Sequence, residues 1–463
     1  MDAKLLFALS FAMFMEFAVW AAWMPVLAAR LLGPLKMTGK QTGWIYATFP
    51  IACIFMPLVS GQLADKYFDT KHILGAAHLL GAVLLFLVAN KTSFKSIFGI
   101  MLLYCLCYTG TLPLVNAILF ANVSDVANQG KVFIWAPIAW ALIGWSLTGW
   151  RWIFKTGEQG KDCLYLAAIL SLVMGVGCLM LLPADAPASA AGTVGAAAGE
   201  MPIVETFKML KDGNFLLFFV VSMIFFGLMQ FYFLGTAQFM QDMGIPNKNV
   251  PASMGIAQAV QAIATFFLMA LFMDKLGYKW TLIVGSTFWL LLYIVYTIPH
   301  TIIARVVVAL FASAFVVVLV GLLAAFVLDQ LEVDVPLGLV RLARIIGIPA
   351  FLLVCFLFLR LTLRGVIIVS QGFHGMAYVL FVIVGQIFAN SQASDKIRNS
   401  MQALLFAATT GVGLFLGTQF AGFIMDKFRQ EGRFQWRSIF FVPCAIALVS
   451  ILVFMIFFKV PTP

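Results

Sequence analysis

The sequence is poor in charge. Only 10% of its 463 residues are Asp, Glu, Lys or Arg, and it has four histidines. Soluble domains carry charge on about a quarter of their residues, so a soluble globular protein is excluded. The 29 basic residues outnumber the 19 acidic ones, but they occur singly in short stretches between apolar runs. That pattern is typical of contact with lipid headgroups and not of a nucleic-acid-binding surface.

Sequence motifs for chemistry are also missing. The seven cysteines lie mostly inside apolar runs, without the spacing of a disulfide framework or a metal site. No Gly-x-x-x-x-Gly-Lys-Ser/Thr loop is present to hold nucleotide phosphates. Paired carboxylates and nucleophile motifs do not line up, and no long polar segment could form a soluble catalytic domain. We therefore expect neither an enzyme nor an ATP-driven pump, and no cofactor or metal.

Long apolar runs fill most of the chain. Hydrophobic residues make up 63% of it, and the mean hydropathy is +1.03. Crossing a bilayer core takes about 20 helical residues, and a helix satisfies its own backbone hydrogen bonds in lipid. The sequence therefore predicts an all-α polytopic membrane protein. Six spans are expected near 5–29, 42–63, 73–90, 97–121, 132–150 and 163–183, and eight more near 214–238, 252–273, 280–298, 303–328, 340–361, 366–389, 402–424 and 438–458.

A stretch rich in Ala, Gly, Pro and Ser divides these runs. It begins at Ala184 and is followed by a more polar piece that ends at Gly213. Such a composition cannot bury enough surface to order itself. We therefore expect an N-terminal half over 1–183, a linker over 184–213 and a C-terminal half over 214–463.

A short Asp-Lys pattern recurs at the ends of spans. It is found as Gly61 with Asp65-Lys66, as Asp274-Lys275 and as Asp426-Lys427. An aspartate at a helix end beside basic residues can pair with a neighbouring helix and hold one state of a two-state bundle. We interpret the residues of the first two copies as conformational gating residues. The alternative is that all are ordinary interfacial charges.

The chain resembles the major facilitator superfamily through its two halves, its central linker and the Asp-Lys motif after the second span. Within that superfamily it is similar to the bacterial nucleoside:proton symporter family. The segments that carry this likeness are Ile51 to Pro57, Ala77 to Ala82, Tyr108 to Asn116, Gly375 to Tyr378 and Gly385 to Phe388. The resemblance implies a major facilitator fold and a secondary active transporter that works by alternating access.

Residues 301–364 look like an insertion in that fold. Because the likeness resumes beyond them in the same order of spans, an even number of crossings must have been added, either two or none. The second apolar run of the insertion contains Arg341, Arg344 and Pro349, so it could instead be an interfacial or re-entrant helix. We expect two six-helix halves with a two-helix insertion.

Glu16 is the only carboxylate in the middle of a clear span. Ionisable side chains are costly inside a membrane, and where they occur they often belong to proton relays. Glu16 is therefore a candidate proton carrier, and a neutral structural glutamate is the alternative. Histidine as a residue type titrates near neutral pH, so His374 is a second candidate. We favour a structural role for His78, which is surrounded by Ala and Leu residues.

Amide and aromatic side chains in the later spans could bind a solute. Gln258 and Gln261 share one helix face, and His374 and Tyr378 share another. Amides can read the edges of a nucleobase, and Tyr378 or Trp140 could stack on one. By resemblance, the substrate-binding positions are Gln230, Gln258, Gln261, His374 and Tyr378. Helix-to-helix hydrogen bonding is the alternative role for the amides. Asn116 matches the family pattern too, and could line the pore or cap its span.

Two positions depart from the family. The family carries an arginine in its fifth span where this chain has Phe133, and an aspartate thought to serve proton coupling where this chain has Val379. A valine cannot titrate. Either Glu16 or His374 has taken over the proton, or the protein is an uncoupled facilitator, or it moves another solute.

The interpretation as a whole is a multi-pass transporter of the inner (plasma) membrane for nucleosides or similar small polar solutes, coupled to protons. Its expected partners are a nucleoside-like substrate, the proton and membrane lipids, without nucleic acid, and we expect a monomer. A membrane sensor or assembly protein that kept the fold and lost transport is the competing hypothesis.

Overall fold

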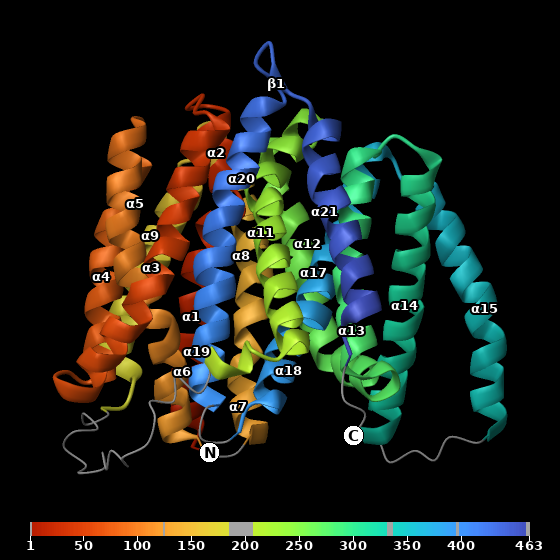
Figure 1. The fold of residues 1–463 in the computed structure, drawn as a ribbon, viewed down its shortest axis with the longest axis horizontal. Helices are drawn as coiled ribbons and strands as arrows, with labels where there is room; N and C mark the ends of the chain where they lie inside the picture. The colour runs from red at the N-terminus through yellow and green to blue at the C-terminus, as the bar shows by residue number, and fades with distance from the viewer. Residues whose placement is uncertain (1, 124–125, 185–206, 331–336, 395–397, 460–463) are drawn as a thin grey trace.

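A computed structural model of the protein describes residues 2–123, 126–184, 207–330, 337–394 and 398–459. The described chain is a bundle of long helices, with both termini at the same end (Figure 1). We call this end the terminal end and the opposite one, which carries a small β-hairpin, the far end. Residues 185–206, most of the predicted linker, lie outside the described part.

Nine helices form the first part of the bundle, which we call the N-terminal half. They are α1 (Ala3–Trp23), α2 (Leu27–Leu32), α3 (Gly39–Lys66), α4 (Thr70–Ala89), α5 (Phe94–Thr109), α6 (Thr111–Asn122), α7 (Val126–Phe133), α8 (Trp135–Phe154) and α9 (Asp162–Leu181). Short breaks separate α1 from α2, α5 from α6 and α7 from α8, so that the nine helices make six crossings.

The remaining elements form the C-terminal half. They are α11 (Gly213–Asp242), η2 (Asn247–Asn249), α12 (Val250–Ile263), η3 (Ala264–Leu268), α13 (Met269–Thr297), α14 (Ile302–Gln330), α15 (Leu337–Leu359), α16 (Leu363–Val369), α17 (Gln371–Ala377), η4 (Tyr378–Ile383), α18 (Val384–Gln392), α19 (Arg398–Phe406), η5 (Ala407–Gly413), α20 (Leu414–Lys427), β1 (Arg429–Gln430), β2 (Arg433–Phe434) and α21 (Trp436–Phe457). Three of them, η3, η4 and η5, are π-helical, a geometry that often marks functional sites.

Twelve stretches of the described residues are long and apolar enough to cross a membrane. One of them, 247–297, makes two crossings, because α13 breaks at Gly277, whose φ of 65° lies in the left-handed region that favours glycine. With α14 and α15 set aside, twelve crossings remain. Figure 1 shows α14 and α15 running in turn along the height of the bundle, on its outside. The predicted all-α polytopic fold is confirmed.

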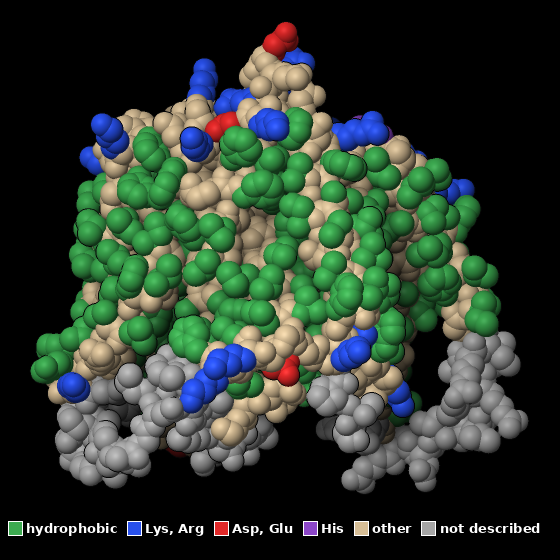
Figure 2. Space-filling model, in the orientation of Figure 1, with side chains coloured by type: hydrophobic (Ala, Val, Ile, Leu, Met, Phe, Trp, Pro, Cys, Tyr) green, Lys and Arg blue, Asp and Glu red, His purple; other side chains and the backbone are tan. Residues whose placement is uncertain are grey.

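Apolar and basic side chains are distributed over the bundle as expected for a membrane-spanning protein. In the face shown in Figure 2, hydrophobic side chains cover the middle of the bundle, and Lys and Arg gather toward its two ends. Polar residues begin several helices at those ends. The Thr38 side chain accepts from the Gln41 N–H in a capping box at the start of α3, and Asp212 caps α11.

Glycines bring the two halves together near the far end. A side chain at Gly43 in α3 would overlap the carbonyl oxygen of Thr418 in α20, and one at Gly144 in α8 would overlap that of Pro251 in α12. Small residues permit this close approach of helices in membranes, where packing replaces the hydrophobic effect. The two contacts flank the centre of the bundle, where the candidate site lies.

Candidate functional site

Aromatic rings form a continuous cluster across the interface between the halves. The Trp20 ring of α1 stacks on Phe49 of α3 with centroids 4.5 Å apart, and meets the Trp140 ring of α8 edge-on at 5.3 Å. Trp140 in turn lies 6.5 Å from Phe233 of α11 in the other half. Flat rings from both halves therefore face one another.

A pocket lies beside this cluster, and we call it the central pocket. Its free space is about 10 Å³, about the room that one water molecule needs. A larger solute can enter only if the halves move apart. The residues that line it are Ala21, Pro25, Val26, Trp140, Gly144, Leu147, Tyr232, Phe233, Pro251, Met254, Gly255 and Gln258.

The structure brings several of the predicted binding residues to this place. Trp140 and Gln258 line the central pocket. The His374 ring stacks on Tyr232, a lining residue, with centroids 4.0 Å apart and planes 7° apart. Gln230 lies one helical turn before Phe233 on α11 and is 1% exposed, and neither its amide nitrogen nor its amide oxygen has a hydrogen-bond partner.

Three other predicted residues lie farther from the lining. Gln261 is buried one turn beyond Gln258, where α12 packs closely on Gly375 of α17. Tyr378 is half-buried and begins the π-helical η4. Asn116 is half-buried in the middle of α6, away from the end of that helix, and is not among the lining residues of the pocket.

The sequence interpretation nominated Trp140 but missed the other aromatic residues that build the site. Tyr232 is buried and Trp20 is half-buried, and the buried Trp20 Nε1 and Tyr232 hydroxyl have no hydrogen-bond partner. A signal for Trp20 existed, because it lies four residues after Glu16 and so on the same helix face. Tyr232 and Phe233 lie next to the nominated Gln230, but aromatic residues are too common here, 14% of the chain, to stand out.

His374 has its own fixed partner. The indole N–H of Trp289 donates to His374 Nδ1 at 3.2 Å. A nitrogen that accepts a hydrogen bond carries no proton, so the network assigns His374 as a neutral ring with its hydrogen on Nε2. In this arrangement His374 can offer one N–H donor.

Glu16 lies in a second polar cluster, wholly inside the N-terminal half. Its Oε2 is 2.9 Å from His78 Nε2 on α4, and its Oε1 is 2.7 Å from the Thr111 hydroxyl, whose single hydrogen can go to Glu16 or to the Tyr108 carbonyl. The Tyr108 hydroxyl donates to the Glu16 carbonyl at 2.7 Å, and His78 Nδ1 is 3.2 Å from Ser171 Oγ on α9. Glu16 and His78 are 0% and 2% exposed. Five helices, α1, α4, α5, α6 and α9, thus contribute to the cluster around one buried carboxyl group.

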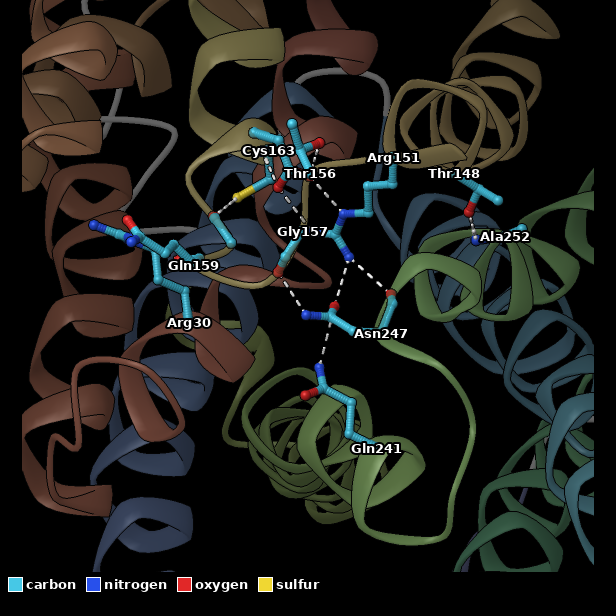
Figure 3. A network of polar contacts seen from close by, with 12 residues as sticks. Arg30, Thr148, Arg151, Thr156, Gly157, Gln159, Cys163, Gln241, Asn247 and Ala252 are labelled. Carbon is cyan, nitrogen blue, oxygen red and sulfur yellow. Dashed lines mark hydrogen bonds and ion pairs between the residues drawn. The ribbon is translucent and has the colours of Figure 1, made fainter. Parts of the chain in front are cut away.

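A polar network joins the halves at the far end (Figure 3). The Arg151 guanidinium binds both carboxylate oxygens of Asp162, at 2.7 and 2.9 Å. Its third nitrogen donates to the carbonyl and the side-chain oxygen of Asn247, in the loop before α12, both at 2.9 Å. The Asn247 amide donates back to the Gly157 carbonyl. An ion pair of one half therefore holds a loop of the other, and we call this contact the far-end latch.

Asp426 makes a second contact between the halves at the same end. Its carboxylate accepts from the backbone N–H groups of Gly39 and Lys40, at 2.6 and 2.8 Å, at the start of α3. A carboxylate is favoured at a helix N-terminus, where N–H groups lack partners.

The predicted gating residues lie elsewhere. Lys66, Asp274 and Lys275 are exposed, and Gly61 has open space where a side chain would be. The Asp65 side chain lies outside the described part. The copy of the motif that joins the halves is the third one, which was not nominated.

Comparison with known proteins places the chain among transporters. The model of the family described as "Nucleoside H+ symporter" matches residues 3–328 and 361–463, and the unmatched residues fall inside the predicted insertion. YegT of Escherichia coli (strain K12) is 26% identical over 97% of this chain and 93% of that protein, and the nucleoside permease NupG of the same organism is 23% identical over 96% and 94%. A solved structure of a NupG variant has the same fold, with a TM-score of 0.75 and 22% identity over 98% of this chain and 100% of that chain.

Proposed function

The chain belongs to the nucleoside H+ symporter family, and we propose that it binds the base of a nucleoside in the central pocket and carries it across the inner membrane with a proton. The observation that carries this proposal is the pairing of flat aromatic rings with buried polar groups that lack partners. Such groups are costly to bury, so each one needs a hydrogen bond that a ligand can supply.

The aromatic rings suit a base because every nucleobase has a flat π-face. Trp140 reaches the pocket from one half, and Tyr232 and Phe233 reach it from the other. Stacking on such a ring is worth about 1–3 kcal/mol per base and depends little on which base it is. The rings therefore supply affinity for the class of solute.

The polar groups suit the edges of the base or the ribose hydroxyls. Gln258 lines the pocket, and Gln230, one turn before the lining residue Phe233 on α11, has both atoms of its amide unpartnered. An amide offers two donors and an acceptor, and a site built to pair such groups rejects solutes that cannot pair with them. The amides, with the Tyr232 hydroxyl, supply selectivity.

Transport also requires both contacts at the far end to open. With the far-end latch and the Asp426 contact closed, the pocket holds about 10 Å³ of free space. We infer that rocking of the halves breaks these contacts and widens the pocket, which is the alternating access expected of this fold.

The test is counterflow of a labelled nucleoside panel in proteoliposomes. Trp140→Ala should weaken apparent affinity about tenfold or more for every transported nucleoside, because stacking is lost. Gln258→Leu should instead change the order of preference among nucleosides. Trp280→Ala, which removes an exposed tryptophan, is the matched control and should behave as the wild type. Unchanged affinity and preference in both pocket variants would place the substrate elsewhere.

The competing functions are a non-transporting membrane sensor and an uncoupled facilitator. Family membership does not favour either of them. Uptake that ignores an imposed proton gradient would point to the facilitator, and no uptake of any nucleoside would point to the sensor.

A further inference from the structure

We propose that the transported proton is held on the contact between Glu16 and His78, inside the N-terminal half, with Ser171 as the residue that positions it. The proposal rests on the proton-coupled transport described above. It gives His78 a part in coupling, and it places the proton in the opposite half from Val379.

The hydrogen bonds of Ser171, His78 and Glu16 indicate how many protons these side chains carry. The Ser171 hydroxyl donates its only hydrogen to the His78 carbonyl, at 2.8 Å. Ser171 Oγ must therefore accept from His78 Nδ1, 3.2 Å away, and Nδ1 carries a hydrogen. With Nδ1 occupied, the 2.9 Å contact between His78 Nε2 and Glu16 Oε2 needs one more proton. That proton sits on one atom or the other, as a neutral pair or as an ion pair.

Removing this proton while the ring hydrogen stays on Nδ1 breaks the contact. The carboxylate would then face the lone pair of Nε2, and two acceptors 2.9 Å apart repel each other. The proton leaves to solvent, and Glu16 keeps a negative charge in the apolar interior of the bundle. With Ser171 donating to the His78 carbonyl, the observed geometry is the loaded form. Unloading must either separate α1 from α4 at this depth or move the ring hydrogen to Nε2 while the Ser171 hydroxyl turns to Nδ1.

Within the part of the chain that the structure describes, no hydrogen bond or ion pair joins the Glu16 carboxyl to any cation, other than His78, that could replace the proton. The titratable groups that interact electrostatically with Glu16 are His78 from α4, Tyr104 and Tyr108 from α5, and Cys178 from α9. The charged side chains of α7 and α8 lie at the last turns of those helices, as Lys131 and Arg151. A bare carboxylate at this position is costly, which drives the protein either to rebind a proton or to rearrange.

The proton site is connected to the central pocket through α1. Trp20 lies one turn after Glu16, and its ring meets Trp140 in the pocket lining. Tyr108 links the same two residues of α1. Its hydroxyl donates to the Glu16 carbonyl, and its ring centroid lies 6.4 Å from that of Trp20. Movement of α1 on unloading would shift the aromatic wall of the pocket. His374, by contrast, has its Nδ1 engaged by Trp289.

The first experiment compares gradient-driven accumulation with counterflow in proteoliposomes that hold the full chain. At one proton per nucleoside, a gradient of one pH unit sustains about tenfold accumulation in the wild type. Glu16→Gln mimics the permanently loaded form, so accumulation should vanish while counterflow persists. His78→Gln should do the same. Glu431→Gln, at an exposed acid in the hairpin, should accumulate as the wild type does. Normal accumulation in Glu16→Gln would overturn the proposal.

Ser171→Ala tests the positioning role. It leaves both titrating groups in place but frees the histidine ring, so the pH of half-maximal accumulation should shift while counterflow is kept. A merely structural serine would alter the amount of folded protein and leave the pH profile unchanged, and that result would remove Ser171 from the proposal.

The second experiment does not depend on the substrate. Infrared difference spectra of the purified protein between acidic and alkaline pH should contain a carboxyl band that Glu16→Gln abolishes and imidazole bands that His78→Gln abolishes. Spectra identical to the wild type would overturn the proton site even if nucleosides are transported. Loss of the bands in a protein that moves no nucleoside would uphold the proton site and reject the proposed function.

Discussion

The two halves of this transporter bury different chemistry. Among the described residues, the buried carboxylates and guanidiniums all belong to the N-terminal half, as Glu16, Arg30, Arg151 and Asp162. The C-terminal half buries amides, hydroxyls and one histidine instead, and it contains the three π-helical segments. Charge needs exact partners in a low dielectric, whereas amides and rings can pair with a visiting solute. The contrast suggests that one half handles charge while the other adapts to the substrate.

The largest expected effect comes from breaking the ion pair of the N-terminal half. Arg151→Leu leaves Asp162 buried without its partner, which should cost about 3–5 kcal/mol of stability. The matched change in the other half is Gln371→Leu, which removes a hydrogen bond to the Tyr296 hydroxyl and should cost about 1 kcal/mol. Thermal unfolding followed by tryptophan fluorescence measures both. Equal losses would erase the contrast between the halves.

A carboxyl group placed in the C-terminal half should not restore what the family has there. Val379 is 0% exposed and packs in an apolar cluster with Val260, Met376 and Leu380. Val379→Asp would bury an acid without a built partner and should cost about 1–3 kcal/mol. Combined with Glu16→Gln, it should leave accumulation absent. Val379→Thr controls for the loss of a methyl group, and recovered accumulation in the double variant would show that the proton can use either half.

The smallest expected effect concerns the far-end latch. Asn247→Ala keeps the Arg151–Asp162 pair. It removes the side-chain bonds that join Asn247 to Arg151 and Gly157 in the other half, together with a long one from Gln241 in its own half. Opening toward the far end should become easier by a few fold, for a loss of about 1 kcal/mol. Labelling of a cysteine introduced as Leu147→Cys, in a background without reactive native cysteines, reports that opening. If labelling does not rise, the latch is not what holds the far end closed.

The positions of the helices could be predicted from the sequence because the length of an apolar run is a local property of the chain. The predicted spans near 252–273 and 280–298 flank the break at Gly277. The order of the spans allowed either two added crossings or none, and the two apolar runs of the insertion favoured two. The π-helical segments were not foreseen, because their single extra residue leaves no mark on a hydropathy pattern.

The site was predicted less completely, because pairing across helices is not local. Glu16 stood out as a lone mid-span acid, but its contact with His78 joins residues 62 positions apart. Neighbours on one helix, all Ala and Leu, suggested only packing for His78. Trp20 and Tyr232 could not be predicted for the same reason. Each is distinguished from other aromatic residues by a buried polar atom without a partner, and this depends on contacts between helices.

The contact of Asp426 with the start of α3 has an evolutionary consequence. Its donors are backbone N–H groups of Gly39 and Lys40, which persist whatever side chain occupies position 40, proline excepted. Genetic drift at position 40 therefore leaves this contact intact, whereas Gly39 is held by packing, because a side chain there would overlap the Gly422 carbonyl oxygen. A single codon, that of residue 426, can weaken or abolish the contact. Selection on how readily the transporter opens should act on the acceptor side.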